Sequence, residues 1–198
     1  MTLRFLFLVL EEHPYGREML RILLERGLCP AAVIEESSPV ADEERLKFLT
    51  RIAGEPVPPL MDDLLAASPI PCHQVANHND SACLDLLRGY RPDLLVLGGT
   101  RIVSPDLLAI PPRGTVNAHP GLLPWLRGSS SVGWALYKDL PLGASVHFVE
   151  PTIDTGPVIL KRRLDVRRGA RYEAVERAML TLAGTLMAEA LALLAKGT

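Results

Sequence analysis

The chain has 198 residues, of which 48% are hydrophobic and 22% are charged. This composition is typical of a globular protein and excludes a disordered one, and the length favours a single domain over residues 1–198. The formal net charge of −2 lacks the basic excess that is typical of nucleic-acid binding proteins. We therefore expect a small-molecule partner and no nucleic acid.

The first ten residues are almost all apolar and resemble a signal peptide at first sight. Glu11, Glu12 and Arg17 end this run well before the roughly 18 residues that a membrane span needs, and no small-residue cleavage site follows. We interpret the run as a buried strand, and we expect a soluble cytoplasmic protein that does not bind membranes.

Strand-like and helix-like patterns alternate along the chain. Residues 3–10 predict a strand covered on both faces, Pro14 suits the start of a helix that ends near Gly27, and residues 31–34 predict a second parallel strand. The remaining patterns predict strands at 70–75, 92–97, 115–116, 144–149 and 158–164, and helices at 42–52, 61–67, 129–137 and 172–195, with one more helix capped by Asn79 or Asp80. The order predicts an α/β fold, with a Rossmann-like, mostly parallel sheet and helices on both faces.

Cysteine and histidine residues cluster in one short segment, which raises the question of a metal site. Cys72, His73, His78 and Cys83 lie within twelve residues, but no C-x-x-C or H-x-x-x-H pair is present. Buried thiols beside loop histidines are the simpler interpretation, so no metal site is predicted. The odd number of cysteines, with Cys29 as the third, fits a reducing compartment.

Two polar side chains follow a short apolar strand in the stretch 114–128. Asn117 and His119 lie at the predicted strand end, and Pro120 and Pro124 stiffen the turn after them. Asp154 belongs to a second loop. An amide donor, an imidazole and a carboxylate together can polarise a carbonyl group and move a proton, so these three residues are candidates for catalysis.

These residues resemble the formyltransferase family that uses 10-formyltetrahydrofolate, which includes glycinamide ribonucleotide transformylase and methionyl-tRNA formyltransferase. The family pattern is an Asn, a His two residues later, an S/G-L-L-P segment and a distant D-x-G. Here it reads Asn117, His119, Gly-Leu-Leu-Pro at 121–124 and Asp-Thr-Gly at 154–156. The resemblance implies a formyltransferase-like fold and transfer of a formyl group from 10-formyltetrahydrofolate to the amine of a small acceptor.

The resemblance also implies roles for individual residues. Asn117 would hold the oxyanion that forms on the formyl group, His119 would donate or accept a proton, and Asp154 would orient His119. The formyl donor would bind through a loop that two glycines allow to approach a flat ligand, together with the segment after Asp154; the implied binding residues are Gly99, Thr100, Arg101, Ile102, Val103, Thr155 and Gly156. His147 is interpreted as a satisfied strand residue.

The acceptor is left open. A compound like glycinamide ribonucleotide or an amino-sugar nucleotide fits the resemblance, although Glu11 and Glu12 occupy a turn where a phosphate would bind. Transfer RNA is disfavoured because methionyl-tRNA formyltransferases carry an extra C-terminal domain. The alternatives are a 10-formyltetrahydrofolate hydrolase and a folate-binding module with little turnover. Residues 36–71 form a lid, part of the acceptor site or a surface insertion, and we expect a monomer or a homodimer.

Overall fold

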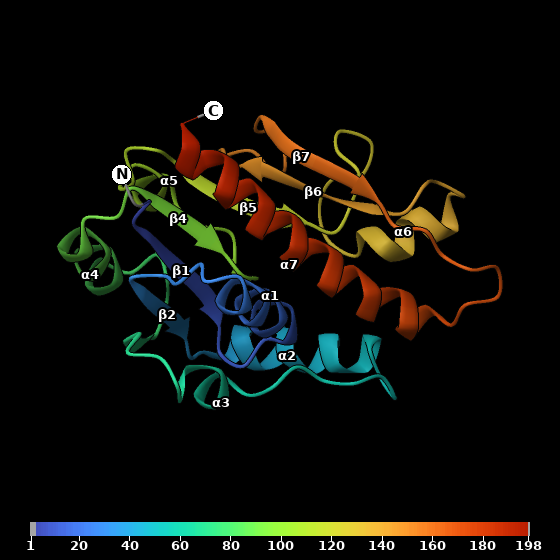
Figure 1. Ribbon diagram of the computed structural model, residues 1–198, viewed down its shortest axis with the longest axis horizontal. Coiled ribbons are helices and arrows are strands. Elements are labelled where there is room, and N and C mark those ends of the chain that lie inside the picture. Colours follow the sequence, from blue (N-terminus) through green and yellow to red (C-terminus); the bar gives the residue numbers. More distant parts are fainter. Residues whose placement is uncertain (1–2, 198) are drawn as a thin grey trace.

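A seven-stranded sheet forms the centre of the protein, whose computed structural model describes residues 3–197 (Figure 1). The strands are β1 (Phe5–Leu10), β2 (Ala32–Glu36), β3 (Cys72–Val75), β4 (Leu94–Leu97), β5 (Thr115–His119), β6 (Gly143–Phe148) and β7 (Val158–Arg163). Their order is β3-β2-β1-β4-β5-β6-β7. The first five strands are parallel, whereas β6 and β7 are antiparallel to their neighbours. The expected mostly parallel sheet is confirmed.

Helices cover both faces of the sheet, as predicted. They are α1 (Pro14–Glu25), α2 (Pro39–Arg51), α3 (Met61–Leu65), α4 (Ser81–Tyr90), α5 (Pro105–Leu108), α6 (Ser131–Tyr137) and α7 (Tyr172–Lys196). One apolar core joins the sheet to α1 and α7, and a second core on the other face joins it to α4 and α5. The strand β1 is buried along its whole length because its side chains pack alternately into the two cores.

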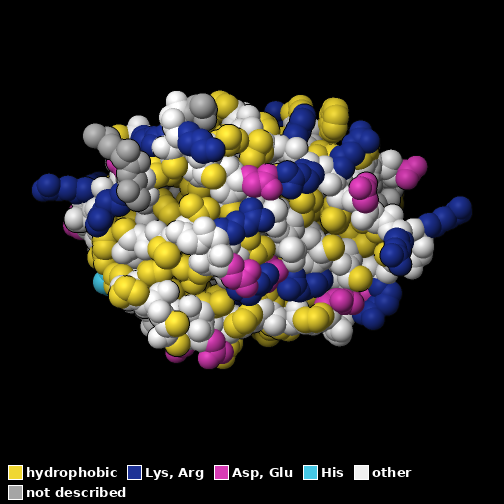
Figure 2. All heavy atoms as spheres, viewed as in Figure 1, with side chains coloured by type: hydrophobic (Ala, Val, Ile, Leu, Met, Phe, Trp, Pro, Cys, Tyr) yellow, Lys and Arg dark blue, Asp and Glu magenta, His cyan; other side chains and the backbone are white. Residues whose placement is uncertain are grey.

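The helix α7 crosses the front of the sheet in Figure 1 and packs along α1 and β6. Among the described residues it is the one helix long and apolar enough to cross a membrane by length and composition. Its apolar side chains are core residues of this fold, including Met179, Ala183 and Leu186. The face over α1 and α7 carries basic and acidic side chains between apolar ones (Figure 2). Glu189 of α7 forms an ion pair with Arg162 of β7.

The start of α2 differs from the sequence-based expectation. The helix begins at Pro39, three residues before the predicted start at position 42. Ser38 Oγ accepts a hydrogen bond from the backbone N–H of Ala41 at 3.3 Å, and Pro39 has the fixed φ that suits the first helical turn. The short helix α3 ends at Leu65 instead of residue 67.

The predicted cap of α4 by Asn79 or Asp80 is wrong at the level of side chains, and the start of α6 is similar. Asp80 and Ser130 occupy the N-cap positions of α4 and α6, but neither side chain caps a backbone N–H within the described part of the chain. Asn79 binds the loop after β4 instead, and Ser131 contacts His119. The same short polar side chains can satisfy local or distant partners, and sequence spacing does not decide between them.

The order of the strands reverses between β1 and β4, so the loops after these two strands diverge and leave a crevice between them. The helix α1 begins very close to the end of β4: a Cβ atom on Gly16 would lie 2.2 Å from the carbonyl oxygen of Gly98. Only glycine permits this approach, which brings the turn after β1 and the loop after β4 to one edge of the sheet.

Candidate active site

A cavity of about 310 Å³ opens at the carboxyl ends of the parallel strands. Its wall consists of His13 and Tyr15 from the start of α1, one face of α2, the loop after β4, the end of β5, the loop before α6, and the segment from His147 to Asp154. Ligands of α/β folds bind at this edge, where the strand order reverses. The predicted residues Asn117 and Asp154 both belong to the wall.

Asp154 lies between two imidazole rings. Its Oδ2 atom is 3.3 Å from His119 Nδ1, and its Oδ1 atom is 3.4 Å from His147 Nε2. Oδ2 also accepts a hydrogen bond of 2.7 Å from the backbone N–H of Gly128. Asp154 has a φ of 51°, a left-handed conformation that is rare for residues other than glycine. These contacts fix the carboxylate at the cavity wall.

Backbone carbonyl groups decide which nitrogen of each imidazole carries a hydrogen. His119 Nε2 lies 2.9 Å from the carbonyl oxygen of Leu126, and His147 Nδ1 lies 2.8 Å from that of Phe148. A carbonyl oxygen can only accept, so both of these nitrogens are protonated in the neutral rings. The opposite nitrogens, Nδ1 of His119 and Nε2 of His147, therefore face Asp154 and can exchange a proton with its carboxylate. The three side chains form a set that can take up a proton and share it.

The electrostatics of this set favour an ionised Asp154 beside neutral His119. Burial raises the pKa of Asp154, but a hydrogen bond from His147, the charge on His119 and the N–H of Gly128 together hold that pKa below its usual value. Burial lowers the pKa of His119 more than the charge of Asp154 raises it. The carboxylate of Asp154 can therefore accept a proton.

Asn117 and His147 face the cavity together, and this differs from the sequence-based interpretation of His147. The two residues are directly opposite each other in the antiparallel pair of β5 and β6. Asn117 Nδ2 lies 3.4 Å from His147 Nε2. His147 is a residue of β6 and also part of the cavity wall, so it belongs to the candidate site. Only knowledge of the register between β5 and β6 identifies it.

His119 lies next to the cavity without forming part of its wall. The residue is 3% exposed, and both ring nitrogens have partners: Asp154 on one side, and Leu126 and Ser131 on the other. The predicted proximity of Asn117, His119 and Asp154 is present in the structure. The ring of His119 acts on the cavity through Asp154, whereas the ring of His147 reaches it directly.

The loop after β4 forms the opposite wall, and all five predicted donor-binding residues from Gly99 to Val103 line the cavity. Gly99 has a φ of 89°, a conformation that favours glycine. Ile102 is 72% exposed and presents an apolar side chain, with Val103 and Leu97 beside it. This slot, with its apolar walls, suits a flat heterocycle such as a pterin. The Arg101 guanidinium binds Glu36.

The two other predicted donor-binding residues, Thr155 and Gly156, lie outside the cavity wall. Thr155 Oγ1 donates to the carbonyl oxygen of Thr152 at 3.0 Å. A Cβ atom on Gly156 would lie 1.9 Å from the carbonyl oxygen of Phe148. At position 156 the glycine thus lets the loop after β6 pack closely against its own strand.

Glu11 and Glu12, which follow β1, take part in contacts within the protein. Glu12 pairs with Arg17 at 2.6 Å and accepts the backbone N–H of Met61 at 3.0 Å. Glu11 accepts hydrogen bonds from Ser37 and Gln74. Carboxylates thus occupy the turn in which a helix N-terminus would otherwise attract an anion.

The cysteine and histidine cluster is dispersed in the fold. Within residues 3–197 no group of three or more His, Cys, Asp or Glu side chains is arranged to hold a metal ion. Cys29 and Cys72 are exposed, and Cys83 is buried in the core under α4. His73 pairs with Tyr90 Oη at 2.6 Å, and His78 contacts Glu36.

A comparison of the sequence with known families identifies the family of this chain. A family model described as "Formyl transferase" matches residues 27–191. The chain belongs to the formyl transferase family, which is a family of enzymes.

Two relatives of similar sequence are named for a tRNA substrate. The methionyl-tRNA formyltransferase of Anaeromyxobacter sp. (strain K) is 33% identical over 130 residues, which cover 65% of this chain and 42% of that protein. The corresponding protein of Porphyromonas gingivalis is 30% identical over 146 residues, covering 73% and 45%. The chain thus spans less than half the length of these relatives. Because they are named for a tRNA substrate, the expected exclusion of nucleic acid is not supported.

Solved structures share the fold. Glycinamide ribonucleotide transformylase 1 from Symbiobacterium toebii superposes with a TM-score of 0.75 at 24% identity, over 98% of this chain and 89% of that one. A formyltetrahydrofolate deformylase from Pseudomonas syringae pv. tomato superposes with a TM-score of 0.71 at 18% identity, over 96% and 60%. At these identities the likeness establishes the architecture and not the substrate.

Proposed function

We propose that the protein transfers a formyl group from 10-formyltetrahydrofolate to the amine of a small acceptor. The observation that carries this proposal is the position of Asp154, which contacts two imidazoles and lies with Asn117 in the wall of one cavity that is partly apolar. In this reaction a new C–N bond forms, the bond from the formyl carbon to N10 of the donor breaks, and one proton moves from the attacking nitrogen to N10.

Each residue has a distinct part in this reaction. Asn117 Nδ2 donates to the oxygen of the formyl group while negative charge builds on it, a contribution of about 2.7–4 kcal/mol for one such donor. Asp154 takes the proton of the attacking amine and shares it with His119 Nδ1 and His147 Nε2, which face its two oxygens. The same set then returns the proton to the leaving nitrogen. The loop from Gly99 to Val103 holds the donor.

Arg51 gives information about the acceptor. Its guanidinium lines the cavity, donates to Ser130 Oγ at 3.3 Å and lies over the ring of Phe48. Within residues 3–197 it forms no ion pair, whereas Arg101 pairs with Glu36. We therefore infer that the acceptor carries a phosphate or carboxylate that binds Arg51. Glycinamide ribonucleotide-like compounds and amino-sugar nucleotides both carry phosphate.

The hydrolase is the second candidate because the deformylase mentioned above has the same architecture. A water molecule beside Asp154 would replace the amine and release formate. Because the side chains around Asp154 serve either nucleophile, the two activities differ only in what occupies the acceptor side near Arg51.

The decisive experiment incubates the purified protein with 10-formyltetrahydrofolate and a panel of amines, with and without phosphate or carboxylate groups, including methionyl-tRNA. Mass spectrometry identifies formylated products, and tetrahydrofolate release is measured in parallel. We expect formylation of an anionic small amine. Donor cleavage of equal rate without any amine would support the hydrolase, and binding without consumption would support the folate-binding module.

Cytoplasmic localisation, a single domain and a monomeric or homodimeric state stay predictions. Fractionation of cells that express the protein and light scattering of the purified protein test the first and third of these.

A further inference from the structure

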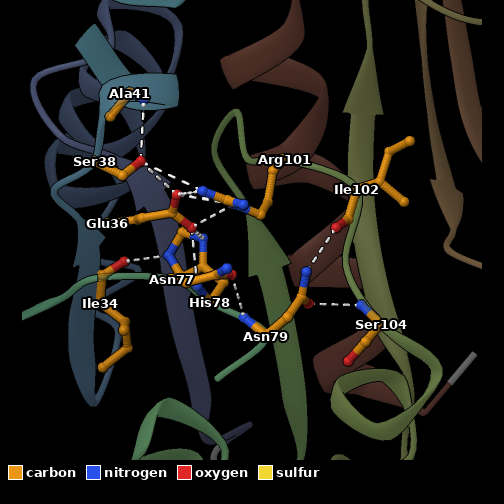
Figure 3. Close-up of polar contacts among 10 residues, drawn as sticks. All are labelled: Ile34, Glu36, Ser38, Ala41, Asn77, His78, Asn79, Arg101, Ile102 and Ser104. Atoms are coloured by element: carbon orange, nitrogen blue, oxygen red, sulfur yellow. Dashed lines mark hydrogen bonds and ion pairs between the residues drawn. The ribbon is translucent and has the colours of Figure 1, made fainter. Parts of the chain in front are cut away.

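A fully buried carboxylate connects the end of β2 to the loop after β4 (Figure 3). Glu36 is 0% exposed. Arg101 Nε donates to its two oxygens at 2.8 and 2.9 Å, and Arg101 Nη2 makes a further contact with Oε1. Ser38 Oγ donates at 2.7 Å, and the backbone N–H of His78 donates at 2.9 Å. Glu36 thus gathers donors from three separate segments.

Asn79 holds the same loop at a second point. Its Nδ2 atom donates to the carbonyl oxygen of Ile102 at 3.0 Å, and its Oδ1 atom accepts the backbone N–H of Ser104 at 2.7 Å. The backbone N–H of Asn79 in turn binds Asn77 Oδ1 at 2.9 Å. Figure 3 shows the side chain of Asn79 directed at this loop, with its contacts to Ile102 and Ser104.

The direction of the Arg101 side chain has a consequence for ligand binding. Its guanidinium is bound to Glu36, a carboxylate that has no access to solvent. Moving the guanidinium toward a ligand would leave the buried negative charge without its arginine. The loop lines the cavity from Gly99 to Val103, while the charge of the only cationic side chain in the stretch 98–104 is bound within the protein.

We propose that Glu36 and Asn79 are positioning residues for the formyl donor: together they fix the loop at 98–104 in the shape that receives the flat ring. This inference rests on the proposed function. Glu36 acts through Arg101, and Asn79 acts through the backbone of Ile102 and Ser104. Neither residue touches the cavity, so both act on donor affinity and leave the chemistry around Asp154 unchanged.

The test compares Glu36→Gln and Asn79→Ala with the wild-type protein. Glu36→Gln removes the charge that Arg101 binds and retains the size of the side chain, and Asn79→Ala removes both loop contacts. We expect each change to raise the KM for 10-formyltetrahydrofolate about tenfold, equivalent to about 1.4 kcal/mol, with kcat and the acceptor KM within about twofold of wild type.

Asp85→Asn is the matched control because it breaks an exposed ion pair with Arg88 on α4, the helix that follows Asn79. Urea unfolding of every variant identifies a folding defect, and half-buried Asn79 keeps the test valid if Glu36→Gln does not fold. A donor KM equal to wild type in folded Asn79→Ala, or equal losses of affinity for donor and acceptor, would overturn the proposal.

Direct binding separates this proposal from the proposed function. Calorimetric titration with 5-formyltetrahydrofolate, a stable isomer of the donor, needs no acceptor. Binding to the wild type with weaker binding to both variants supports the positioning role. Equal binding to all three proteins contradicts the positioning role alone, and absence of binding to the wild type contradicts the proposed function itself.

Discussion

Asp154 is the residue on which the candidate site depends, because its two oxygens each face a ring nitrogen of an imidazole. Asn117, His119 and Asp154 could be predicted from sequence because their order and separation form a recognisable pattern. His147 could not, since its position follows from the pairing of β5 with β6 across 30 residues of sequence. Long-range strand register is not encoded in any local spacing.

We predict that Asn117 and His147 act as a unit. Asn117→Ala should lower kcat about 10²–10³-fold, and His147→Asn should have a comparable effect because it removes the acceptor that orients Asn117. The double variant should be little worse than either single one, since both changes abolish the same arrangement. Single-turnover rates measure this. His73→Asn on β3, distant from Asp154, serves as the control, and additive losses would contradict the prediction.

Arg51 is expected to determine affinity for an anionic acceptor. Arg51→Ala should raise the acceptor KM tenfold or more and leave the donor KM unchanged, because a charge-assisted contact is lost on one side of the cavity only. The acceptor KM of the wild type should rise with salt, and that of the variant should not. Arg45→Ala on the same helix is the control, since Arg45 pairs with Asp42. A neutral acceptor used equally well by both proteins would refute the role.

At the scale of elements, the sequence predicted the strands well because continuous apolar runs, such as those of β1 and β4, favour buried parallel strands. Helix ends were predicted less well. Ser38 caps α2 before the predicted start. Asn79 instead forms a hydrogen bond with the loop after β4, and Ser131 contacts His119. A polar side chain at a helix start has several possible partners, and tertiary contacts select among them.

The loop after β6 offers a test at this scale. In Gly156→Ala the new Cβ would lie 1.9 Å from the carbonyl oxygen of Phe148, so the loop must shift and Asp154 moves with it. We predict a fall in kcat of more than tenfold and a loss of about 1–3 kcal/mol in the free energy of unfolding. Steady-state kinetics and urea titration measure the two effects.

Gly89→Ala in α4 is the matched control, because the Cβ atom there would have no described neighbour within 4 Å. It should raise stability by up to about 1 kcal/mol through helix propensity and leave kcat unchanged. Normal activity of Gly156→Ala would show that the position of Asp154 does not depend on the close packing of this loop.

At the scale of the whole molecule, acid should destabilise the fold partly through His13. Burial, followed by the charges of Arg51 and Arg17, lowers the pKa of His13 from 6.5 to about 4. His13 Nδ1 accepts the backbone N–H of Tyr15 and so caps α1, which requires an unprotonated ring. Because the folded pKa lies below the unfolded one, this contribution is complete above pH 6.5 and is lost as the pH falls toward 4.

The prediction compares urea unfolding of the wild type and His13→Asn at pH 7 and pH 5. Asparagine retains a capping oxygen and does not titrate. The wild type should lose about 2 kcal/mol more than the variant between the two pH values. Other titrating groups, such as Glu35 and Glu176, whose pKa values burial raises, are common to both proteins and cancel in the difference. Parallel losses in the two proteins would contradict the assignment.

The pairing of β6 with β7 is irregular between Val146 and His147. Such an irregularity separates the demands on one strand: Val146 stays in the apolar core, while the next residue is aimed at the cavity edge. The end of β6 that lies at the cavity, from His147 onward, can therefore change its orientation without a rearrangement of the core beneath it. Substitutions after position 146 should therefore alter the choice of nucleophile, amine or water, with the smallest loss of folding stability.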